Sequence, residues 1–122
     1  MIATLTDVET ELTVHIVTGD IDVRRLISTL RILQETATRL VLWDLREASN
    51  IGSSSSAKVE SITSRLKDIP VLAGGKAAFV FASATDYGMG RMYEAYAKME
   101  NLSFDLAMFQ SMSEAESWLQ SD

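Results

Sequence analysis

The chain contains no cysteine, and it has a single histidine, His15. The first absence excludes disulfide bonds, thiolate metal ligands and a cysteine nucleophile. A serine–histidine–carboxylate triad would have to use His15, which lies in the middle of a predicted strand without a local partner. We therefore expect a structural role for this imidazole, no catalytic residue, no metal site and no cofactor.

Long apolar runs and clustered positive charges are also missing. No stretch approaches the roughly 20 residues of a membrane span. The first residues, MIATLTDVETEL, include acids where a signal peptide needs a basic start and then an apolar run. Of the 11 basic residues only Arg24 and Arg25 are adjacent, and the net charge is −6. We therefore expect a cytoplasmic protein that binds neither nucleic acid nor anionic membranes.

The length and the apolar content indicate one folded domain that spans residues 1–122. Hydrophobic residues make up 47% of the 122 positions, which is enough for a core. Within this length there is no repeat and no linker, so a second domain is not expected.

Hydrophobic periodicity predicts strands that alternate with helices. Strands are expected at residues 2–6, 12–18, 40–45, 76–82 and 104–109, and helices at 23–36, 54–68, 86–101 and 113–120. The continuous apolar run at 40–45 is typical of a strand covered on both faces, and the alternation at 104–109 is typical of an edge strand. The order ββαβαβαβα predicts an α/β fold with a mixed, mostly parallel sheet of about five strands covered by about four helices.

Two local motifs predict where elements begin. The run Ala73-Gly74-Gly75 predicts a loop before the strand at 76–82. The spacing Ser113-x-x-Glu116 predicts a capping box, in which Ser113 begins the last helix.

The segment VLWDLREASNIGSSSS, around Asp44, resembles the phosphorylation-site segment of STAS domains, which anti-sigma-factor antagonists and sulfate transporters share. There a central strand ends in Asp-Leu, a loop follows, and a serine begins the next helix. Counted from Asp44, that serine is Ser53. The segments YGMGRMYEAYAKMENLSFDLAMF and SEAESWL are similar to a bacterial group of small stand-alone STAS-like proteins with no established activity. The resemblance covers nearly the whole chain and implies a STAS-like fold and a regulatory, protein-binding role.

The serine run differs from the regulatory pattern of that family. The family usually shows Asp-Ser-Ser-Gly-Leu, whereas this chain has glycine followed by four serines, Gly52 to Ser56. A serine here can serve as an N-cap. The functional alternative is a regulatory phosphoserine at Ser53 or Ser54, because a phosphate at a helix N-terminus meets free N–H groups.

Polar residues at the predicted carboxyl ends of the central strands form a second candidate site. The segment from Asp86 to Arg91 contains Gly88-x-Gly90, but the third glycine of a dinucleotide-binding turn is replaced by Tyr93. The glycines would then relieve crowding between helix and sheet, or their N–H groups would join Arg91 in holding a carboxylate or phosphate. The predicted loop-edge binding surface comprises Asp44, Arg46, Asp86, Tyr87, Gly88, Gly90 and Arg91.

A stripe of methionine and tyrosine recurs at helical spacing along the helix expected at 86–101. Its members are Met89, Met92, Tyr93, Tyr96 and Met99. The stripe most often indicates a core face. Alternatively, these adaptable side chains line a site for a small apolar or lipid-like ligand, or a homodimer contact.

Three functional hypotheses follow from these sites. The first is a non-catalytic regulatory or protein-interaction module that uses the loop edge. The second is a carrier or sensor of a small apolar or lipid-like ligand bound against the helix at 86–101. An enzyme is the least favoured, because the sequence offers no histidine-centred relay, metal cluster or phosphate loop.

Overall fold

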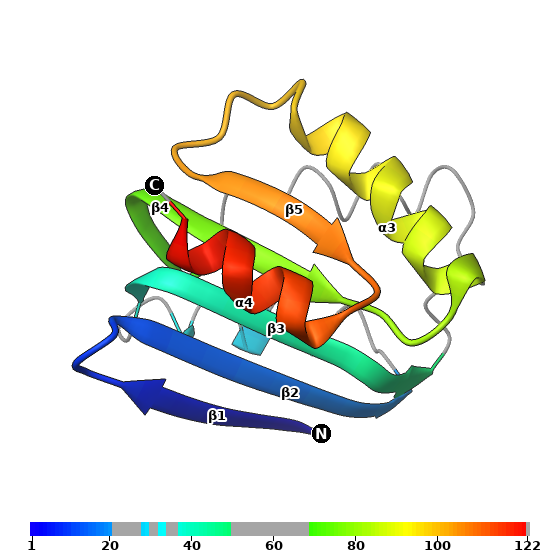
Figure 1. Ribbon diagram of the computed structural model, residues 1–122, viewed down its shortest axis with the longest axis horizontal. Coiled ribbons are helices and arrows are strands. Elements are labelled where there is room, and N and C mark those ends of the chain that lie inside the picture. The colour runs from blue at the N-terminus through cyan, green and yellow to red at the C-terminus, as the bar shows by residue number, and fades with distance from the viewer. Residues whose placement is uncertain (21–27, 30–31, 34–36, 50–68, 122) are drawn as a thin grey trace.

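Five strands form one sheet in which the spatial order follows the chain, β1-β2-β3-β4-β5 (Figure 1). The computed structural model describes residues 1–20, 28–29, 32–33, 37–49 and 69–121. Its elements there are β1 (Ile2–Asp7), β2 (Leu12–Asp20), β3 (Thr38–Ser49), β4 (Val71–Val80), α3 (Ala84–Ala97), β5 (Asp105–Phe109) and α4 (Met112–Gln120).

The pairing of the strands makes the sheet mixed and mostly parallel, as the sequence predicts. β1 and β2 are antiparallel, and the pairs β2–β3, β3–β4 and β4–β5 are parallel. A short turn suffices for the first pair, in which Asp7 Oδ1 accepts the N–H of Glu9 at 3.0 Å and Glu11 takes φ 55°.

Of the four predicted helices, two lie in the described part of the chain, as α3 and α4. The predicted helix at 54–68 and most of the one at 23–36 lie outside the described residues, although Ser28, Thr29, Ile32 and Leu33 are helical. None of the described helices is long and apolar enough to cross a membrane.

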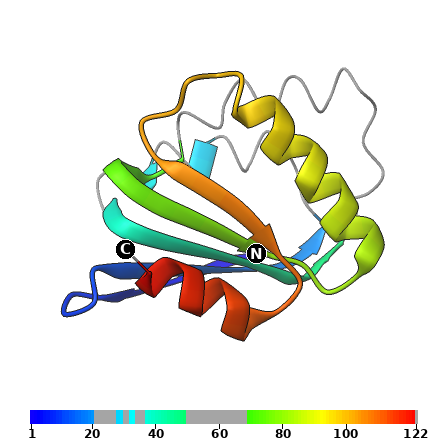
Figure 2. The same cartoon turned by 45° about the horizontal axis from the view of Figure 1, so that its top comes forward.

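The central strand β3 is covered on both faces. Side chains alternate along a strand, so Leu40 and Leu42 face one side while Val41 and Trp43 face the other. Leu40 and Leu42 pack with Ala115 and Leu119 of α4. Trp43 belongs to the cluster on the opposite side, together with Ala97 of α3 and residues of β4 and β5. Figure 2 shows α3 and α4 on opposite faces of the sheet.

Helix α3 approaches the sheet closely because it has a glycine at the contact. A Cβ on Gly90 would stand 2.5 Å from the ring of Phe81. The prediction that these glycines relieve crowding is therefore confirmed for Gly90, whereas nothing lies within 4 Å of a Cβ on Gly88. The helix begins at its N-cap Ser83, whose hydroxyl accepts the N–H of Asp86 at 3.1 Å. It ends at Ala97, before Asn101, which takes φ 55°.

Several predicted boundaries are wrong. β3 runs to Ser49 instead of ending at residue 45, and α3 ends at Ala97 instead of residue 101. The residues Ala73 to Gly75 are not a loop but part of β4, and a Cβ on Gly75 would stand 2.1 Å from the carbonyl oxygen of Arg39. Glycine there lets β4 lie against the neighbouring backbone. The N-cap of α4 is Ser111 rather than Ser113, and it accepts the N–H of Glu114 at 3.3 Å.

The C-terminus of α4 is held by Lys76 of β4. Its ammonium donates to the carbonyl oxygens of Trp118 at 2.9 Å and Ser121 at 2.6 Å. It also lies 5.1 Å from the centre of the Trp118 ring. The carbonyl of Trp118 also accepts the N–H and the hydroxyl of Ser121, so Lys76 is an additional donor at this helix end. A cation at this position also complements the negative end of the helix dipole.

Candidate functional site

Asp44 and Arg46 form a bidentate ion pair within β3, at the point where the pairing of β3 with β4 ends. Arg46 Nε donates to Asp44 Oδ1 at 2.9 Å, and Nη2 donates to Oδ2 at 2.9 Å. The backbone N–H of Arg46 adds a bond of 3.1 Å. These hydrogen bonds lower the pKa of Asp44, against the opposing effect of partial burial. Asp44 is therefore ionised near neutral pH and bound through both oxygens, which suits an anchor for the arginine rather than a general base.

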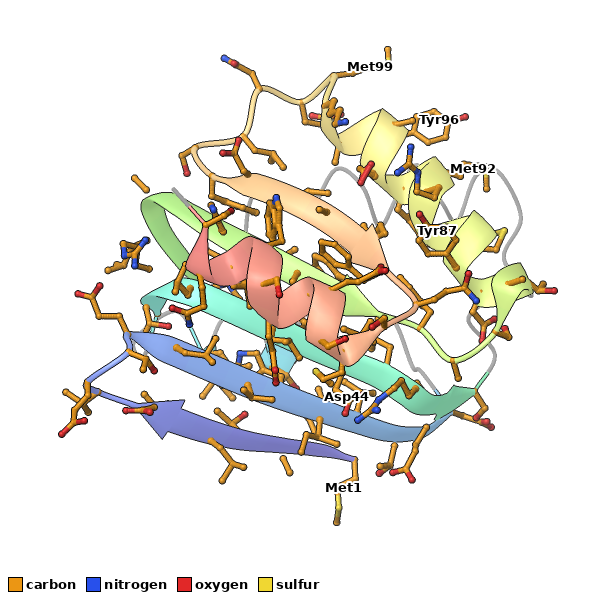
Figure 3. The ribbon with its side chains drawn as sticks, viewed as in Figure 1. Met1, Asp44, Tyr87, Met92, Tyr96 and Met99 are labelled. Atoms are coloured by element: carbon orange, nitrogen blue, oxygen red, sulfur yellow. The ribbon has the colours of Figure 1, made fainter. Side chains whose placement is uncertain are left out.

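The start of α3 lies at the same edge of the sheet as this ion pair. Asp44 is in register with Val80, the last residue of β4, and α3 begins shortly afterwards, at Ala84 (Figure 3). The ion pair and the start of α3 lie on different faces of the sheet. Asp44 follows Leu42 by two residues and so lies on the α4 face, whereas Tyr87 packs on the cluster of the α3 face.

The other predicted loop-edge residues have distinct environments. Asp86 is half-buried in the first turn of α3, and Gly88 is exposed. Arg91 is also exposed, and its Nη1 lies 3.6 Å from Glu94 Oε2. The phosphosite candidates Ser53 and Ser54 lie outside the described residues.

The apolar stripe of α3 is not a core face, so that prediction is wrong. Helix α3 buries Gly90, Glu94 and Ala97 instead. Met92 is 37% exposed and Met99 is 81% exposed. Met89, Tyr93 and Tyr96 are half-buried. At Gly90 the reason is the close contact with the ring of Phe81, which leaves no room for a larger side chain.

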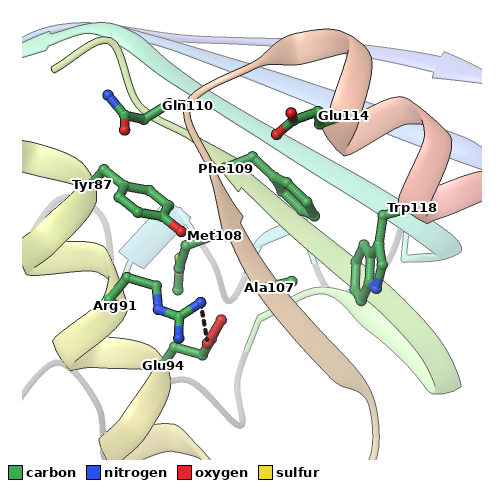
Figure 4. Close-up of a pocket in the computed structure, with 9 residues that line it drawn as sticks. All are labelled: Tyr87, Arg91, Glu94, Ala107, Met108, Phe109, Gln110, Glu114 and Trp118. Carbon is green, nitrogen blue, oxygen red and sulfur yellow. Dashed lines mark ion pairs between the residues drawn. The ribbon is translucent and has the colours of Figure 1, made fainter. Parts of the chain in front are cut away.

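A groove of about 400 Å³ runs along the last strand, between α3 and α4 (Figure 4). Its lining comes from three elements, namely Tyr87, Arg91 and Glu94 of α3, Ala107, Met108, Phe109 and Gln110 at β5, and Glu114 and Trp118 of α4. Of these, only Tyr87 and Arg91 are among the predicted site residues. The edge position of β5 was predicted, but a single sequence does not tell which helices flank it.

Glu94 is the most unusual residue of this groove. Its side chain is 7% exposed, and its Oε2 lies 3.6 Å from Arg91 Nη1 and 3.7 Å from Lys98 Nζ. Both distances exceed the roughly 2.8 Å of a charge-assisted hydrogen bond. Glycine at Gly90, one turn earlier, is the sequence signal that this face of α3 points inward.

His15 is buried in β2 and packs on Trp43, with ring centres 4.3 Å apart. Its Nδ1 is 2.8 Å from the hydroxyl of Thr4. Burial lowers the pKa of His15 from 6.5 to about 4, so the ring is neutral at physiological pH. In the described ranges, no group of three or more histidine, aspartate or glutamate side chains is placed to hold a metal ion.

Comparisons with known proteins bear on the fold. No protein-family model matches the sequence, and no curated protein matches it. Among solved structures, the crystal structure of an anti-sigma factor antagonist from Mycobacterium paratuberculosis matches with a TM-score of 0.61 and 13% identity. The match covers 99% of this chain and 96% of that one. This chain is thus folded like an anti-sigma factor antagonist, which is the fold that the resemblance of its sequence implies.

Proposed function

We propose that this protein is a non-catalytic regulatory module that acts in the cytoplasm by binding another protein. The observation that carries the proposal is the fold match over 99% of the chain to a protein described as an anti-sigma factor antagonist. The ion pair of Asp44 and Arg46 supports it, because the buried carboxylate at the edge of the sheet is already engaged through both oxygens. Its role is then to fix an arginine at a protein-binding surface.

The binding surface in this proposal is the loop edge at the carboxyl ends of β3 and β4. Arg46 and Arg91 have side chains that are 47% and 58% exposed, so both offer donors to a partner. Ser53 and Ser54 are the regulatory residues of the proposal. A phosphate on either would add negative charge and thereby change the affinity of a partner that contacts these serines.

The test is capture of a specific partner by the tagged protein in its native host. The partner is identified by mass spectrometry and then purified. Its affinity is measured for the wild-type protein, the Ser53→Asp variant and one control variant. We expect Ser53→Asp to weaken binding at least tenfold. The control Ser103→Asp, at an exposed residue before β5, should leave the affinity unchanged. Equal binding by all three proteins would remove Ser53 from the proposal.

A second candidate function is a carrier or sensor of a small apolar or lipid-like ligand. Its support is the exposure of Met92 and Met99 on α3, since flexible methionines accept varied apolar partners. The same face offers a contact for a homodimer. Native mass spectrometry of freshly purified protein separates the outcomes, because a ligand adds a fixed mass and a homodimer doubles it. Met92→Lys should abolish whichever species forms on this face.

A further inference from the structure

We propose that the partner inserts an extended peptide along the free edge of β5, with a lysine or arginine of that peptide bound to Glu94. This inference rests on the proposed function, since it names how a protein partner is held. The site adjoins the loop edge, with which it shares Tyr87 and Arg91, and it differs from the loop edge in chemistry. It consists of the outer edge of β5 and the two helix walls that flank this edge.

The backbone of β5 offers unpaired groups to such a peptide. β5 pairs with β4 alone, and Phe109 O accepts the N–H of Phe81 at 2.9 Å. The groups of Phe109 and Ala107 thus point toward β4. Since the direction alternates along a strand, those of Leu106 and Met108 point away from the sheet. Within the described part of the chain no strand pairs with this edge. An added strand would use these N–H and C=O groups in register.

The walls of the groove fit one strand and its side chains. Neighbouring strands lie about 4.8 Å apart, and side chains of an added strand alternate toward its two faces. Figure 4 shows Tyr87 of α3 on one side of β5 and Trp118 of α4 on the other. Trp118 packs on Phe109, with ring centres 5.7 Å apart. Successive side chains of the peptide would therefore meet an aromatic wall on each side.

Glu94 gives the groove its preference for a basic side chain. A carboxylate that is 93% shielded from water, as its 7% exposure implies, is costly without short hydrogen bonds. Arg91 and Lys98 approach it from the same helix, but their side chains are 58% and 70% exposed and stand beyond hydrogen-bond distance. A guanidinium or ammonium entering the groove would add short bonds to these two longer ion pairs. Glu114 on the opposite wall adds negative charge.

Charge also disfavours a second copy of the chain at this edge. Two β5 edges paired around a two-fold axis would bring Glu94, Glu114 and Asp105 of both copies together. The net charge of −6 would oppose such a pair further. A segment with a basic residue between β-forming residues is the better complement.

The test is selection of 12-residue peptides from a random display library against the whole protein. We expect the selected peptides to share an alternating apolar pattern with one lysine or arginine, and to protect the amides of Leu106 and Met108 from hydrogen exchange. Glu94→Gln should weaken binding by about tenfold or more. Replacing the basic residue by norleucine should weaken binding to the wild type but not to the Glu94→Gln variant.

Two further measurements separate strand addition from other modes of binding. Met108→Pro removes one outward N–H, and Pro is tolerated at a strand edge, but it also removes a core side chain that is 6% exposed. Where circular dichroism shows that this variant is folded, we expect it to have lost the peptide. If this variant does not fold, a peptide N-methylated at alternate amides gives the same information with the wild-type chain. Selection of no peptide family, protection elsewhere, full binding of the N-methylated peptide, or a dimer that Met108→Pro dissolves would each overturn the inference. The Ser53 experiment tests the proposed function independently.

Discussion

Gly90 lies directly against the ring of Phe81, so closely that a methyl group at the glycine would stand 2.5 Å from the nearest ring carbon. We expect Gly90→Ala to lower the free energy of unfolding by about 1–3 kcal/mol, because the overlap exceeds the gain in helix propensity. Gly88→Ala is a matched control two residues earlier, with nothing within 4 Å of the new methyl. It should raise the stability by about 0.5–1 kcal/mol. Urea unfolding of the two variants measures both effects, and equal effects would contradict the contact.

Acid should weaken the fold through His15. Its pKa is about 4 in the folded protein and 6.5 when the chain is unfolded. The unfolded state therefore binds the proton first, so stability is intact above pH 6.5 and is lost as the pH falls toward 4. The loss between pH 7 and pH 5 should be about 2 kcal/mol by proton linkage. Urea unfolding at both pH values checks it, and His15→Gln should remove most of the difference. If the free energy of unfolding of this variant fell with pH as steeply as that of the wild type, a group other than His15 would be responsible.

The stabilisation by the ion pair of Asp44 and Arg46 is lost at a lower pH than the stabilisation that depends on neutral His15. Because the pKa of Asp44 is lowered in the folded state, its contribution is complete above the ordinary value of 3.8 and is lost as the pH falls below it. Arg46→Lys keeps the charge but loses the bidentate geometry. Since Arg46 is 47% exposed, we expect a loss of only about 1 kcal/mol at pH 7. In Asp44→Asn the effect of Arg46→Lys should vanish, which a double-mutant cycle in urea would detect.

Lys76 should be more important for stability than an average surface lysine. Lys76→Met should lower the free energy of unfolding by about 1–2 kcal/mol, because the carbonyl of Ser121 loses its ammonium donor and that of Trp118 keeps only the donors of Ser121. Lys98→Met is the control, since this side chain is 70% exposed. Thermal unfolding followed by circular dichroism should show a clear drop in Tm for the first variant and almost none for the second. A similar drop in both would argue against the cap.

Local sequence patterns predicted the sheet well, because the residues of a single strand are enough to show whether its faces are buried and how its side chains alternate. The run at 40–45 became the buried centre of β3, and the alternation at 104–109 became the edge strand β5. In β2, however, the sequence did not tell which face is deeper. Thr13 and His15 are more buried than Leu12 and Val14. Thr13 Oγ1 bonds to Thr38 Oγ1 at 2.8 Å and His15 Nδ1 to the hydroxyl of Thr4 at 2.8 Å, and this pairing with neighbouring strands depends on the tertiary fold. His15 Nε2 has no such partner among the described residues.

The misjudged features depend on contacts between distant segments. Ser111-x-x-Glu114 and Ser113-x-x-Glu116 have the same capping spacing, and the packing of Ala115 and Leu119 selected the earlier start. The face of α3 that contacts the sheet carries Gly90 instead of the methionine and tyrosine stripe, because the ring of Phe81 leaves no room for a larger side chain there. The groove and Glu94 were not predicted at all, since they arise where α3, β5 and α4 meet.

The agreement between chain order and strand order also bears on how the molecule is synthesised. Every strand of the sheet lies next to the strand that left the ribosome before it. Pairing can therefore proceed from the N-terminal hairpin outward, and no strand has to be threaded between two others that have already joined. β5 and α4 are the last of these elements to be synthesised, so β4 forms the edge of the sheet in a nascent chain until residues 105–120 have emerged.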